Sequence, residues 1–413
     1  MLSRRIFVSR SALGLFSLAV SQSFLGRSLR ALASDAKQSK KVLLVIFQRG
    51  AADGLSIVPP IGDADYYKLR PNIGLKMKDE FPPIALDGHF GLNPGMAALK
   101  PFWDEKHLAI IHQAGSPNLT RSHFDAQDFM ESGTPGVKKT DDGYLNRAMQ
   151  LIPEQRKSNL RAVALQTELP RSLRGKFPAI SMDSIHDFGI QGMLAKPQMV
   201  SGFESMYQQA TDQVFRGVGQ EVFDALQTVH KTDEVGAKNK NDLYPKSQIA
   251  RHLKEISELI KADIGLQLAA TDVGGWDTHV NQGNGKGQMS DRLKELAEGL
   301  AAFAKDLGPR FADVMVVTMT EFGRTVKENG NRGTDHGHGS VMMVLGGGVR
   351  GGKVYTQWKD LTAPNLFEGR DLPVTIDYRD VLSELLTKQL ALPSVKDVFP
   401  QFSADATRWL GLV

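Results

Sequence analysis

Between two apolar runs the chain reads Thr318-Met-Thr-Glu-Phe-Gly-Arg-Thr-Val-Lys-Glu-Asn-Gly-Asn-Arg-Gly-Thr-Asp-His-Gly-His-Gly-Ser340. The run Val314–Val317 leads into this stretch, and the run Val341–Leu345 leads out of it. Short continuous apolar runs are typical of buried strands, so the polar residues stand where one predicted strand ends and the next begins. Because α/β folds bind ligands at the ends of their strands, the stretch predicts a site in an α/β fold.

The polar stretch is rich in groups that can bind metals and anions. They are Glu321, Arg324, Asp335, His336 and His338. Glycines between them let the backbone turn sharply and approach a ligand closely. The structural alternative is a solvated Gly-rich loop whose Asp-His pair caps a helix.

Composition narrows the class of protein. With 413 residues, 41% of them hydrophobic and 23% charged, the chain is long enough for one large α/β domain or two smaller ones. The formal net charge of +4 is mild, and much of it comes from the N-terminal segment, so nucleic-acid binding is not expected. The chain has no cysteine, which excludes disulfides, zinc-thiolate sites and thiol nucleophiles. Any metal must therefore be held by oxygen and imidazole.

The N-terminus predicts export. Ser3-Arg-Arg-Ile-Phe-Val8 is similar to a twin-arginine signal, and the moderately apolar stretch Ser11–Leu25 and the small residues of Ala31-Leu-Ala33 follow it. We predict a signal peptide over residues 1–35, export through the twin-arginine translocase, a periplasmic location and no stable membrane span after cleavage. The alternative is an uncleaved anchor, although the apolar stretch is short for a span.

The first predicted strand, Lys41–Phe47, is apolar throughout, as expected for a central parallel strand. It delivers the polar segment Gln48–Gly54, in which Asp53 is either a metal ligand or part of a turn. A helix is predicted over Gly95–Glu105, with Pro94 near its start, and a strand over Leu108–His112.

The segment Gly115–Gly133 predicts a loop followed by a helix. Thr120 or Ser122 would cap that helix, whose N-terminus favours anions. A hydroxyl in this place is either a nucleophile beside an anion site or an ordinary N-cap, and the sequence leaves both open.

The middle of the chain predicts a strand at Ala162–Gln166 and another near Met193 or Met199. A mostly helical insert follows at about 201–263, interrupted by the polar run Lys231–Asn241. Its last helix has apolar residues at helical spacing from Ile249 to Ile260 and a plausible start at Ser247.

The next predicted strand, Gly265–Ala270, delivers Asp272, Asp277 and His279. Asp-x-His places two ligands on one side of an extended segment, a spacing that can grip one cation. An amphipathic helix with leucines from Leu293 to Leu307 then returns to the strand at Val314. Since parallel sheets bring such loops to one edge, we expect the loops 48–54, 116–125, 271–279 and 320–338 to meet in a single domain over residues 36–413.

The motifs together resemble a known family. They are Phe47-Gln-Arg-Gly-Ala-Ala-Asp-Gly54, Thr120-Arg-Ser-His-Phe-Asp125, Gly274-Gly-Trp-Asp-Thr-His279, Glu321-Phe-Gly-Arg324 and Gly333-Thr-Asp-His-Gly-His-Gly339. From about residue 40 onwards the chain is similar to the twin-arginine-exported bacterial family called domain of unknown function 1501, which is grouped more distantly with alkaline phosphatases and sulfatases. That likeness implies a three-layer α/β sandwich around a mostly parallel sheet, a site for one or two metal ions, and phosphoryl or sulfuryl transfer through a hydroxyl nucleophile.

Roles carried over from the resemblance are as follows. An acidic ligand follows the first strand in the wider superfamily, and here Gln48 and Arg49 stand there instead, which leaves Asp53 as the candidate. Ser122 or Thr120 would be the nucleophile. The predicted ligands of a divalent metal, either zinc, calcium, magnesium or manganese, are Asp53, Asp277, His279, Glu321, Asp335, His336 and His338. The guanidinium groups that would clasp the substrate's oxygens are those of Arg49, Arg121 and Arg324.

The sequence thus predicts an exported metal-dependent hydrolase of phosphate or sulfate esters. Its substrate would be a small-molecule or polymer-borne anionic ester. The alternative is a non-catalytic binding or assembly protein that keeps the fold without the full ligand set. A structural metal-binding domain without turnover is a third reading.

Overall fold

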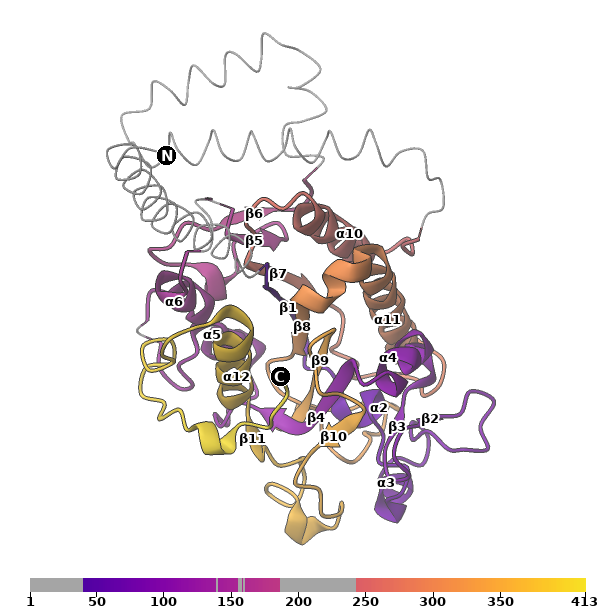
Figure 1. Ribbon diagram of the computed structural model, residues 1–413. Coiled ribbons are helices and arrows are strands. Elements are labelled where there is room, and N and C mark those ends of the chain that lie inside the picture. Colours follow the sequence, from indigo (N-terminus) through magenta and orange to yellow (C-terminus); the bar gives the residue numbers. More distant parts are fainter. Residues whose placement is uncertain (1–39, 139, 155–157, 159, 186–242) are drawn as a thin grey trace, which may run out of the picture. The chain divides into compact units, whose positions relative to one another are not determined.

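This computed structural model describes residues 40–138, 140–154, 158, 160–185 and 243–413, and in them nine strands form one sheet (Figure 1). Their order is β10-β4-β9-β8-β1-β7-β5-β6, and β11 pairs with β4. The strands are β1 (Val42–Gln48), β4 (Leu108–Gly115), β5 (Ala162–Leu165), β6 (Ile180–Met182), β7 (Leu268–Val273), β8 (Val314–Met319), β9 (Ser340–Gly346), β10 (Lys353–Tyr355) and β11 (Ile376–Asp377). A separate hairpin joins β2 (Ile84–Ala85) and β3 (Gly91–Leu92).

The sheet is mostly parallel, as predicted. Among the described strand pairs of this sheet, only those of β9 with β4 and β8 are antiparallel. The strand is reversed because the chain passes from the end of β8 to the start of β9 without crossing over the sheet. Consequently β1, β4, β7 and β8 all end at the same edge of the sheet, where β9 begins.

Strand β1 lies in the centre between β7 and β8 and is buried along its whole length. Side chains on a strand alternate between its two faces. Accordingly Val42, Leu44 and Ile46 belong to one hydrophobic cluster, and the intervening Leu43, Val45 and Phe47 belong to a second. This explains why the sequence of β1 is apolar throughout, and it confirms the prediction of a strand buried on both faces.

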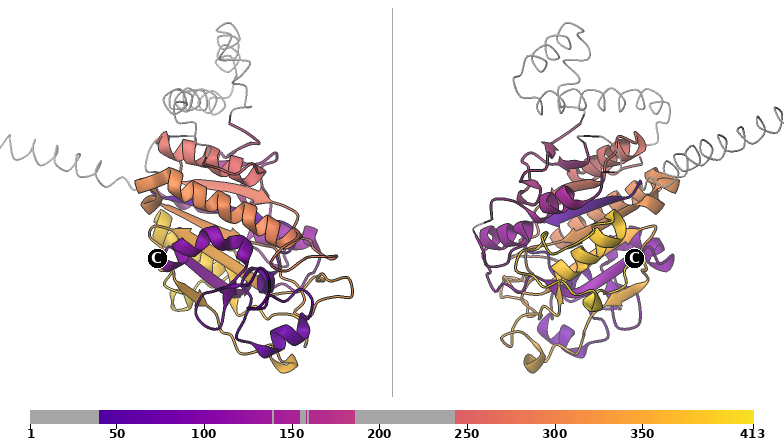
Figure 2. Two further views of the ribbon diagram at one scale, coloured as in Figure 1. Left: turned by 90° about the vertical axis from the view of Figure 1, so that its right-hand side faces the viewer. Right: turned by 60° about the vertical axis from the view of Figure 1, so that its left-hand side comes forward.

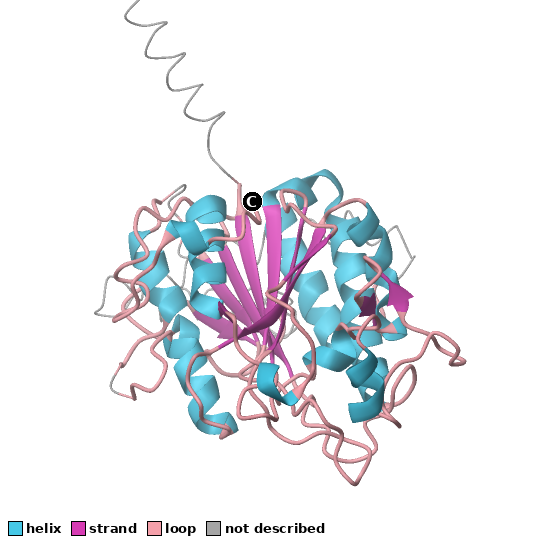
Figure 3. Ribbon diagram, turned by 90° about the horizontal axis from the view of Figure 1, so that it is seen from below, coloured by secondary structure: helices cyan, strands magenta, loops and turns pink. Residues whose placement is uncertain are grey.

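Helices cover both faces, which completes the predicted α/β sandwich (Figures 2 and 3). One face carries η1 (Pro94–Leu99), α4 (Lys100–Asp104), α10 (Gln248–Lys261) and α11 (Gln288–Leu307), and the other carries α5 (His123–Ser132), α6 (Tyr144–Leu151) and α12 (Tyr378–Leu390). Shorter helical segments are α2 (Gly54–Ile57), α3 (Ala64–Leu69), η2 (Arg171–Leu173), η3 (Gly308–Asp313), η4 (Ala363–Asn365) and η5 (Ala406–Arg408). Among the described helices, none is long and apolar enough to cross a membrane.

Several predicted elements end at other residues in the structure. The predicted helix Gly95–Glu105 is two short helices, because Met96 leaves the helical region and Pro101 cannot donate a backbone hydrogen bond. Strand β7 begins at Leu268 and includes Asp272, so this carboxylate lies inside the strand and not beyond it. Sequence patterns place element ends poorly, since pairing with neighbouring strands decides them.

Other predictions concern residues outside the described ones. They are the signal peptide at 1–35, residues 201–242 of the insert, and the strand near Met193 or Met199. The described end of the insert is α10, which begins after Ser247 as predicted, with the Ser247 hydroxyl accepting from the Ala250 amide at 3.3 Å. Helix α10 packs against α11 over the sheet, so it is part of the helical layer of the domain.

Candidate metal centre

The polar residues at the common strand edge come from three connections. His123 is the first residue of α5, which follows β4, and Asp277 and His279 follow β7. Glu321 follows β8, and His336 lies shortly before β9. Residues far apart in the sequence therefore meet here because parallel strands end together.

Possible ligand atoms of His123, Asp277 and His336 all lie within 4.8 Å of one another, and His279 lies beside Asp277 and His336. The Nε2 atom of His336 lies 3.0 Å from Nε2 of His123 and 3.1 Å from Nε2 of His279. The Oδ1 atom of Asp277 lies 2.9 Å from Nε2 of His279 and 3.4 Å from Nε2 of His336, and Oδ2 lies 3.5 Å from Nε2 of His123. Ligands at zinc distances are about 3.3 Å apart in a tetrahedron. The observed spacings around His336 and Asp277 are therefore short enough for these side chains to share a cation.

Each imidazole is held from behind through its other nitrogen. Nδ1 of His123 lies 2.8 Å from Glu321, and Nδ1 of His336 lies 2.9 Å from the carbonyl oxygen of Arg121. Nδ1 of His279 lies 3.3 Å from Asp335. Metal-binding histidines usually donate their second N–H to a carboxylate or carbonyl, which turns the free nitrogen towards the metal. All three rings follow this pattern.

Glu321 stands behind His123 and does not point into the cluster. Its buried carboxylate accepts hydrogen bonds from the amide of Gly50 at 2.8 Å, from Gln127 at 2.9 Å and from the Thr320 hydroxyl at 2.9 Å. Burial alone would raise the pKa of Glu321, but the hydrogen bonds from His123 and Gln127 outweigh it and lower that pKa. Glu321, which the sequence suggested as a ligand, thus orients the ring of His123.

Arg324 holds Asp277 in place. Its buried guanidinium donates to Asp277 Oδ1 at 2.5 Å and to the backbone carbonyls of Gly50, Ala51 and Thr334 at 2.5, 2.7 and 3.2 Å. Burial would raise the pKa of Asp277, but the hydrogen bond and charge of Arg324 outweigh it and lower that pKa. With its donors committed inside the protein, Arg324 serves Asp277 rather than the predicted substrate oxygens.

A glycine makes this arrangement possible. Gly50 has a φ of +114°, and a Cβ at this position would lie 2.8 Å from the amide nitrogen of Asp277. A side chain would therefore push the loop after β1 away from the loop that carries Asp277. The amide of Gly50 also donates to Glu321, so this residue joins the loop after β1 to the loop after β8 as well.

Two other predicted ligands lie elsewhere. Asp53 is buried and pairs with Arg70, whose Nη1 lies 2.6 Å from Oδ2, and it also accepts from Ser56 and Gln282 at 2.6 and 2.7 Å. The ring of His338 packs against Phe367, with 4.7 Å between the ring centres, and burial lowers the pKa of His338. In the described part of the chain, neither side chain is hydrogen-bonded to the cluster.

The predicted hydroxyl nucleophiles are engaged in local structure. Ser122 caps α5 by accepting from the Asp125 amide at 3.5 Å, and the Thr120 hydroxyl accepts from the Ser122 amide at 3.2 Å. No hydrogen bond links either hydroxyl to the three imidazoles within the described residues. The capping alternative that the sequence left open thus describes the observed contacts.

The two remaining predicted arginines are both engaged in ion pairs. Arg49 pairs with Glu131 at 2.8 Å and with Asp272 at 2.5 Å. The guanidinium of Arg121 pairs with Glu368 and Asp371, both at 2.7 Å, while its backbone carbonyl holds His336.

His123 is the site residue that the sequence analysis missed. It lies within the motif Thr120–Asp125, in which the sequence analysis considered the hydroxyls of Thr120 and Ser122 and the guanidinium of Arg121 but not the imidazole. The signal that could have found it is positional: His123 opens a helix directly after a strand-end loop, as a residue in a parallel-sheet site should.

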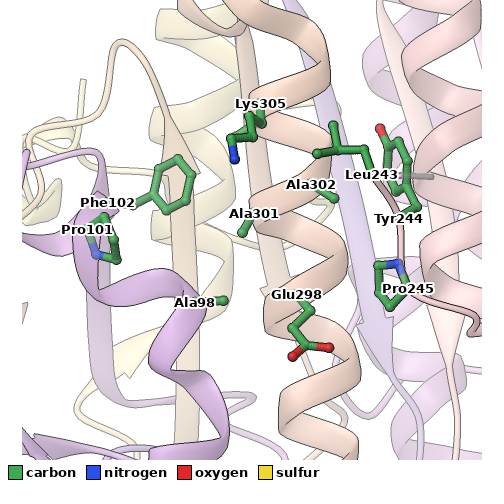
Figure 4. A pocket seen from close by; sticks show the side chains of 11 residues that line it. Ala98, Pro101, Phe102, Leu243, Tyr244, Pro245, Glu298, Ala301, Ala302 and Lys305 are labelled. Atoms are coloured by element: carbon green, nitrogen blue, oxygen red, sulfur yellow. The ribbon is translucent and has the colours of Figure 1, made fainter. Parts of the chain in front are cut away.

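The cluster can be reached from solvent. The side chains of His123 and His336 are 23% and 25% exposed, and those of His279 and Asp277 are 40% and 44% exposed. A separate cavity of about 670 Å³ lies between α4, α11 and the segment at Leu243 (Figure 4). Its walls are largely apolar and contain none of the predicted site residues.

The family comparison supports the resemblance seen in the motifs. The family described as "Protein of unknown function (DUF1501)" matches residues 40–398. The chain belongs to this family. No curated protein matches the chain in sequence.

Solved structures similar to this member of the family are distant from it. One is the C-terminal periplasmic domain of EcEptC from Escherichia coli in complex with zinc, at 11% identity and a TM-score of 0.37, covering 91% of each chain. Another is the PsFucS1 sulfatase from Pseudoalteromonas sp., at 12% identity and a TM-score of 0.40, covering 95% of this chain and 76% of that one. Scores of this size do not identify a metal or a substrate for this protein, so the evidence for both must come from its own side chains.

Proposed function

We propose that this protein is an exported metal-dependent hydrolase of phosphate or sulfate esters, with one divalent ion held by His123, Asp277, His279 and His336. The observation that carries the proposal is that ligand atoms of His123, Asp277 and His336 lie within 4.8 Å of one another, with Nε2 of His279 at 2.9 Å from Asp277 and 3.1 Å from His336. Imidazole nitrogens whose lone pairs face one another repel unless a cation lies between them. A bound cation would accept these lone pairs and remove the repulsion.

The donor set favours zinc among the four candidate metals. Imidazole suits zinc, whereas calcium, magnesium and manganese prefer carboxylate, carbonyl and water oxygens. Three of the four proposed ligands are imidazoles, and the outer carboxylates Glu321 and Asp335 are engaged with His123 and His279. When bound, such an ion acts as a Lewis acid towards an ester oxygen.

The protein's own groups would prepare the site for this chemistry. Glu321, Asp335 and the Arg121 carbonyl keep each Nδ1 as the donor, so that each Nε2 lone pair faces inward. Arg324 keeps Asp277 ionised and fixes its Oδ1. No ligand has to be reoriented when the substrate arrives, which is the advantage of a preorganised site.

An anionic ester is favoured by the charges around the open side. Arg370 donates to the backbone carbonyl of His336, and its side chain is 45% exposed. Arg121 lies next to it and is 32% exposed. A phosphate or sulfate group approaching the cluster would meet these guanidinium groups, although both arginines also pair with Asp371.

One observation favours a second function. Four protein ligands complete a tetrahedron, which is the number found in structural zinc sites, and catalytic sites usually keep one position for water or substrate. A metal-dependent binding or assembly protein without turnover would also fit this number. The exposure of Asp277 and His279 favours the enzyme, because structural sites are closed to solvent.

Export is part of the proposal. The motif Ser3–Val8 favours the twin-arginine translocase and a periplasmic location, and this pathway carries folded proteins, often with a metal or cofactor already bound. Replacing Arg4 and Arg5 with lysines should leave the protein in the cytoplasm, as measured by cell fractionation. Unchanged export of this variant would exclude the pathway.

The deciding experiment combines elemental analysis with assays of an aryl phosphate, a phosphodiester and an aryl sulfate. We expect one zinc ion per chain in the wild type and turnover of one of these ester classes. His279→Ala should lose both, whereas His338→Gln should keep its metal because His338 lies outside the cluster. Wild type with metal but without turnover would favour the binding protein, and protein without metal would overturn the proposal.

A further inference from the structure

A polar pocket of about 570 Å³ borders the candidate metal centre. Its lining includes Arg49, Phe124, Gln127, Glu168, Arg174 and Gln248. Phe124 directly follows His123 on α5, and Gln127 lies one turn further along the same helix. Gln127 donates to Glu321 at 2.9 Å and accepts from Arg49 at 3.1 Å. The wall of the pocket is therefore continuous with the groups that hold the proposed metal ligands.

Ion pairs neutralise most of the charges in this pocket. Arg49 pairs with Glu131 and Asp272, and Arg171 pairs with Asp128 at 2.7 Å. Within the described residues this leaves Glu168 and Arg174, of opposite sign, without an ion-pair partner. A strongly charged ligand would gain little here, whereas a neutral ligand with many hydrogen-bonding groups would find donors and acceptors on the same wall.

One large apolar side chain stands at the rim. The ring of Phe124 is 89% exposed, the highest value among the exposed large hydrophobic residues of the described chain. Leaving an aromatic ring in water forgoes the favourable free energy of its burial. Beside a polar pocket, such a ring offers a flat apolar surface to a ligand that has one apolar face and polar edges.

We propose that this pocket is a subsite for a neutral sugar unit of the ester substrate, an inference that rests on the proposed function. A sugar ring has C–H groups on its faces and hydroxyl groups on its edges. Phe124 would pack against one face of the ring. The planar groups of Glu168 and Arg174 would bind the hydroxyls, since each can engage two neighbouring oxygens.

Sugar binding can be measured without catalysis. The probes are the methyl glycosides of glucose, galactose, mannose, fucose and xylose, added one at a time to the metal-loaded chain and followed by saturation-transfer difference NMR. We expect at least one to bind, and binding to weaken about tenfold in Phe124→Ala and to survive in Phe124→Trp. Phe81→Ala is the matched control, because it removes an exposed ring that does not line the pocket.

The outcomes separate this inference from the proposed function. Ester turnover without binding of any of these sugars by the wild type would overturn the sugar subsite and leave the hydrolase standing. Sugar binding without ester turnover would support the subsite and count against the hydrolase. Binding that is equally strong in Phe124→Ala, with its metal content intact, would overturn the location proposed here.

Discussion

Two buried arginines of this protein each pair with a carboxylate, and only one of the pairs faces solvent. Arg70 binds Asp53 at 2.6 Å, and Arg324 binds Asp277 at 2.5 Å, and neither guanidinium is exposed. Asp53 is 1% exposed, and its oxygens are taken up by Arg70, Ser56 and Gln282. Asp277 is 44% exposed, and its side chain lies among three imidazoles.

The comparison separates stabilisation from function. A carboxylate whose oxygens are satisfied inside the protein has no capacity left for a ligand, and removing it leaves an unpaired buried charge. A carboxylate held on one side and open on the other can bind a cation at little structural cost. The same pairing of Asp with Arg therefore satisfies a buried carboxylate at Asp53 and would orient the proposed metal ligand at Asp277.

The largest effect should come from Asp277→Asn. Because an amide is a much weaker ligand than a carboxylate, we expect loss of the metal and a fall in ester turnover on the order of 10³-fold. The folded state should lose less stability than in Asp53→Asn, because Asp277 is partly exposed and the buried Arg324 keeps the backbone carbonyls of Gly50, Ala51 and Thr334 as acceptors. Elemental analysis, turnover and urea unfolding of the metal-free protein measure the three quantities. Retention of the metal in this variant would remove Asp277 from the proposed ligands.

Asp53→Asn should show the opposite pattern. It leaves the charge of Arg70 buried without its partner, which costs about 3–5 kcal/mol of unfolding free energy. The metal content of the folded variant should equal that of the wild type. Urea unfolding and elemental analysis test both parts, and loss of the metal at unchanged stability would reverse the comparison.

Glu321→Gln should weaken the metal centre without abolishing it. The amide can still accept from Nδ1 of His123, but it is a poorer acceptor, so metal affinity should fall by about 10- to 100-fold. Competition with a chromophoric chelator measures this affinity. Asp335→Asn is the matched variant, and a smaller loss is expected because Asp335 is exposed and holds His279 at the longer distance of 3.3 Å. Equal affinity in all three proteins would show that these carboxylates do not orient the ligands.

The smallest effect concerns pH. Burial would raise the pKa of Asp53, but Arg70 outweighs it and lowers this pKa. A carboxyl group whose pKa is lower in the folded state stabilises the protein above its unfolded pKa of about 3.9, and this contribution is lost as the pH falls through the folded pKa. The stability difference between metal-free wild type and Asp53→Asn should therefore shrink below about pH 4. A difference that is constant from pH 7 to pH 3 would contradict the ionised pair.

Much of the fold was visible in the sequence because its signals are local. The apolar runs of β1 and β8 are continuous in the sequence, and the apolar residues of α10 and α11 recur at helical spacing. The confirmed mostly parallel sheet follows from strands separated by helices. Elements with short or mixed patterns, such as β6 and β10, were not predicted, since their pairing with neighbouring strands defines them.

Part of the candidate site was also within reach of the sequence. The motif around Asp277 and His279 and the Asp-His pair ending at His336 pointed to metal ligands, and the structure brings these three residues together. The sequence could not show which of Glu321 and His123 faces the other imidazoles, because both follow strand ends. Their order, with the imidazole in front and the carboxylate behind it, depends on a contact between residues 198 positions apart.

Sequence pattern was thus sufficient for the α/β class, for the edge at which polar loops gather, and for the kinds of atoms that a metal could find there. Whether a given polar group faces solvent or a buried partner was decided only by the tertiary structure. Asp53 and Asp277 show this, since each follows a central strand and each binds an arginine. Burial and hydrogen-bond saturation arise from packing between distant segments, and they determine which carboxylate retains the capacity to bind an ion.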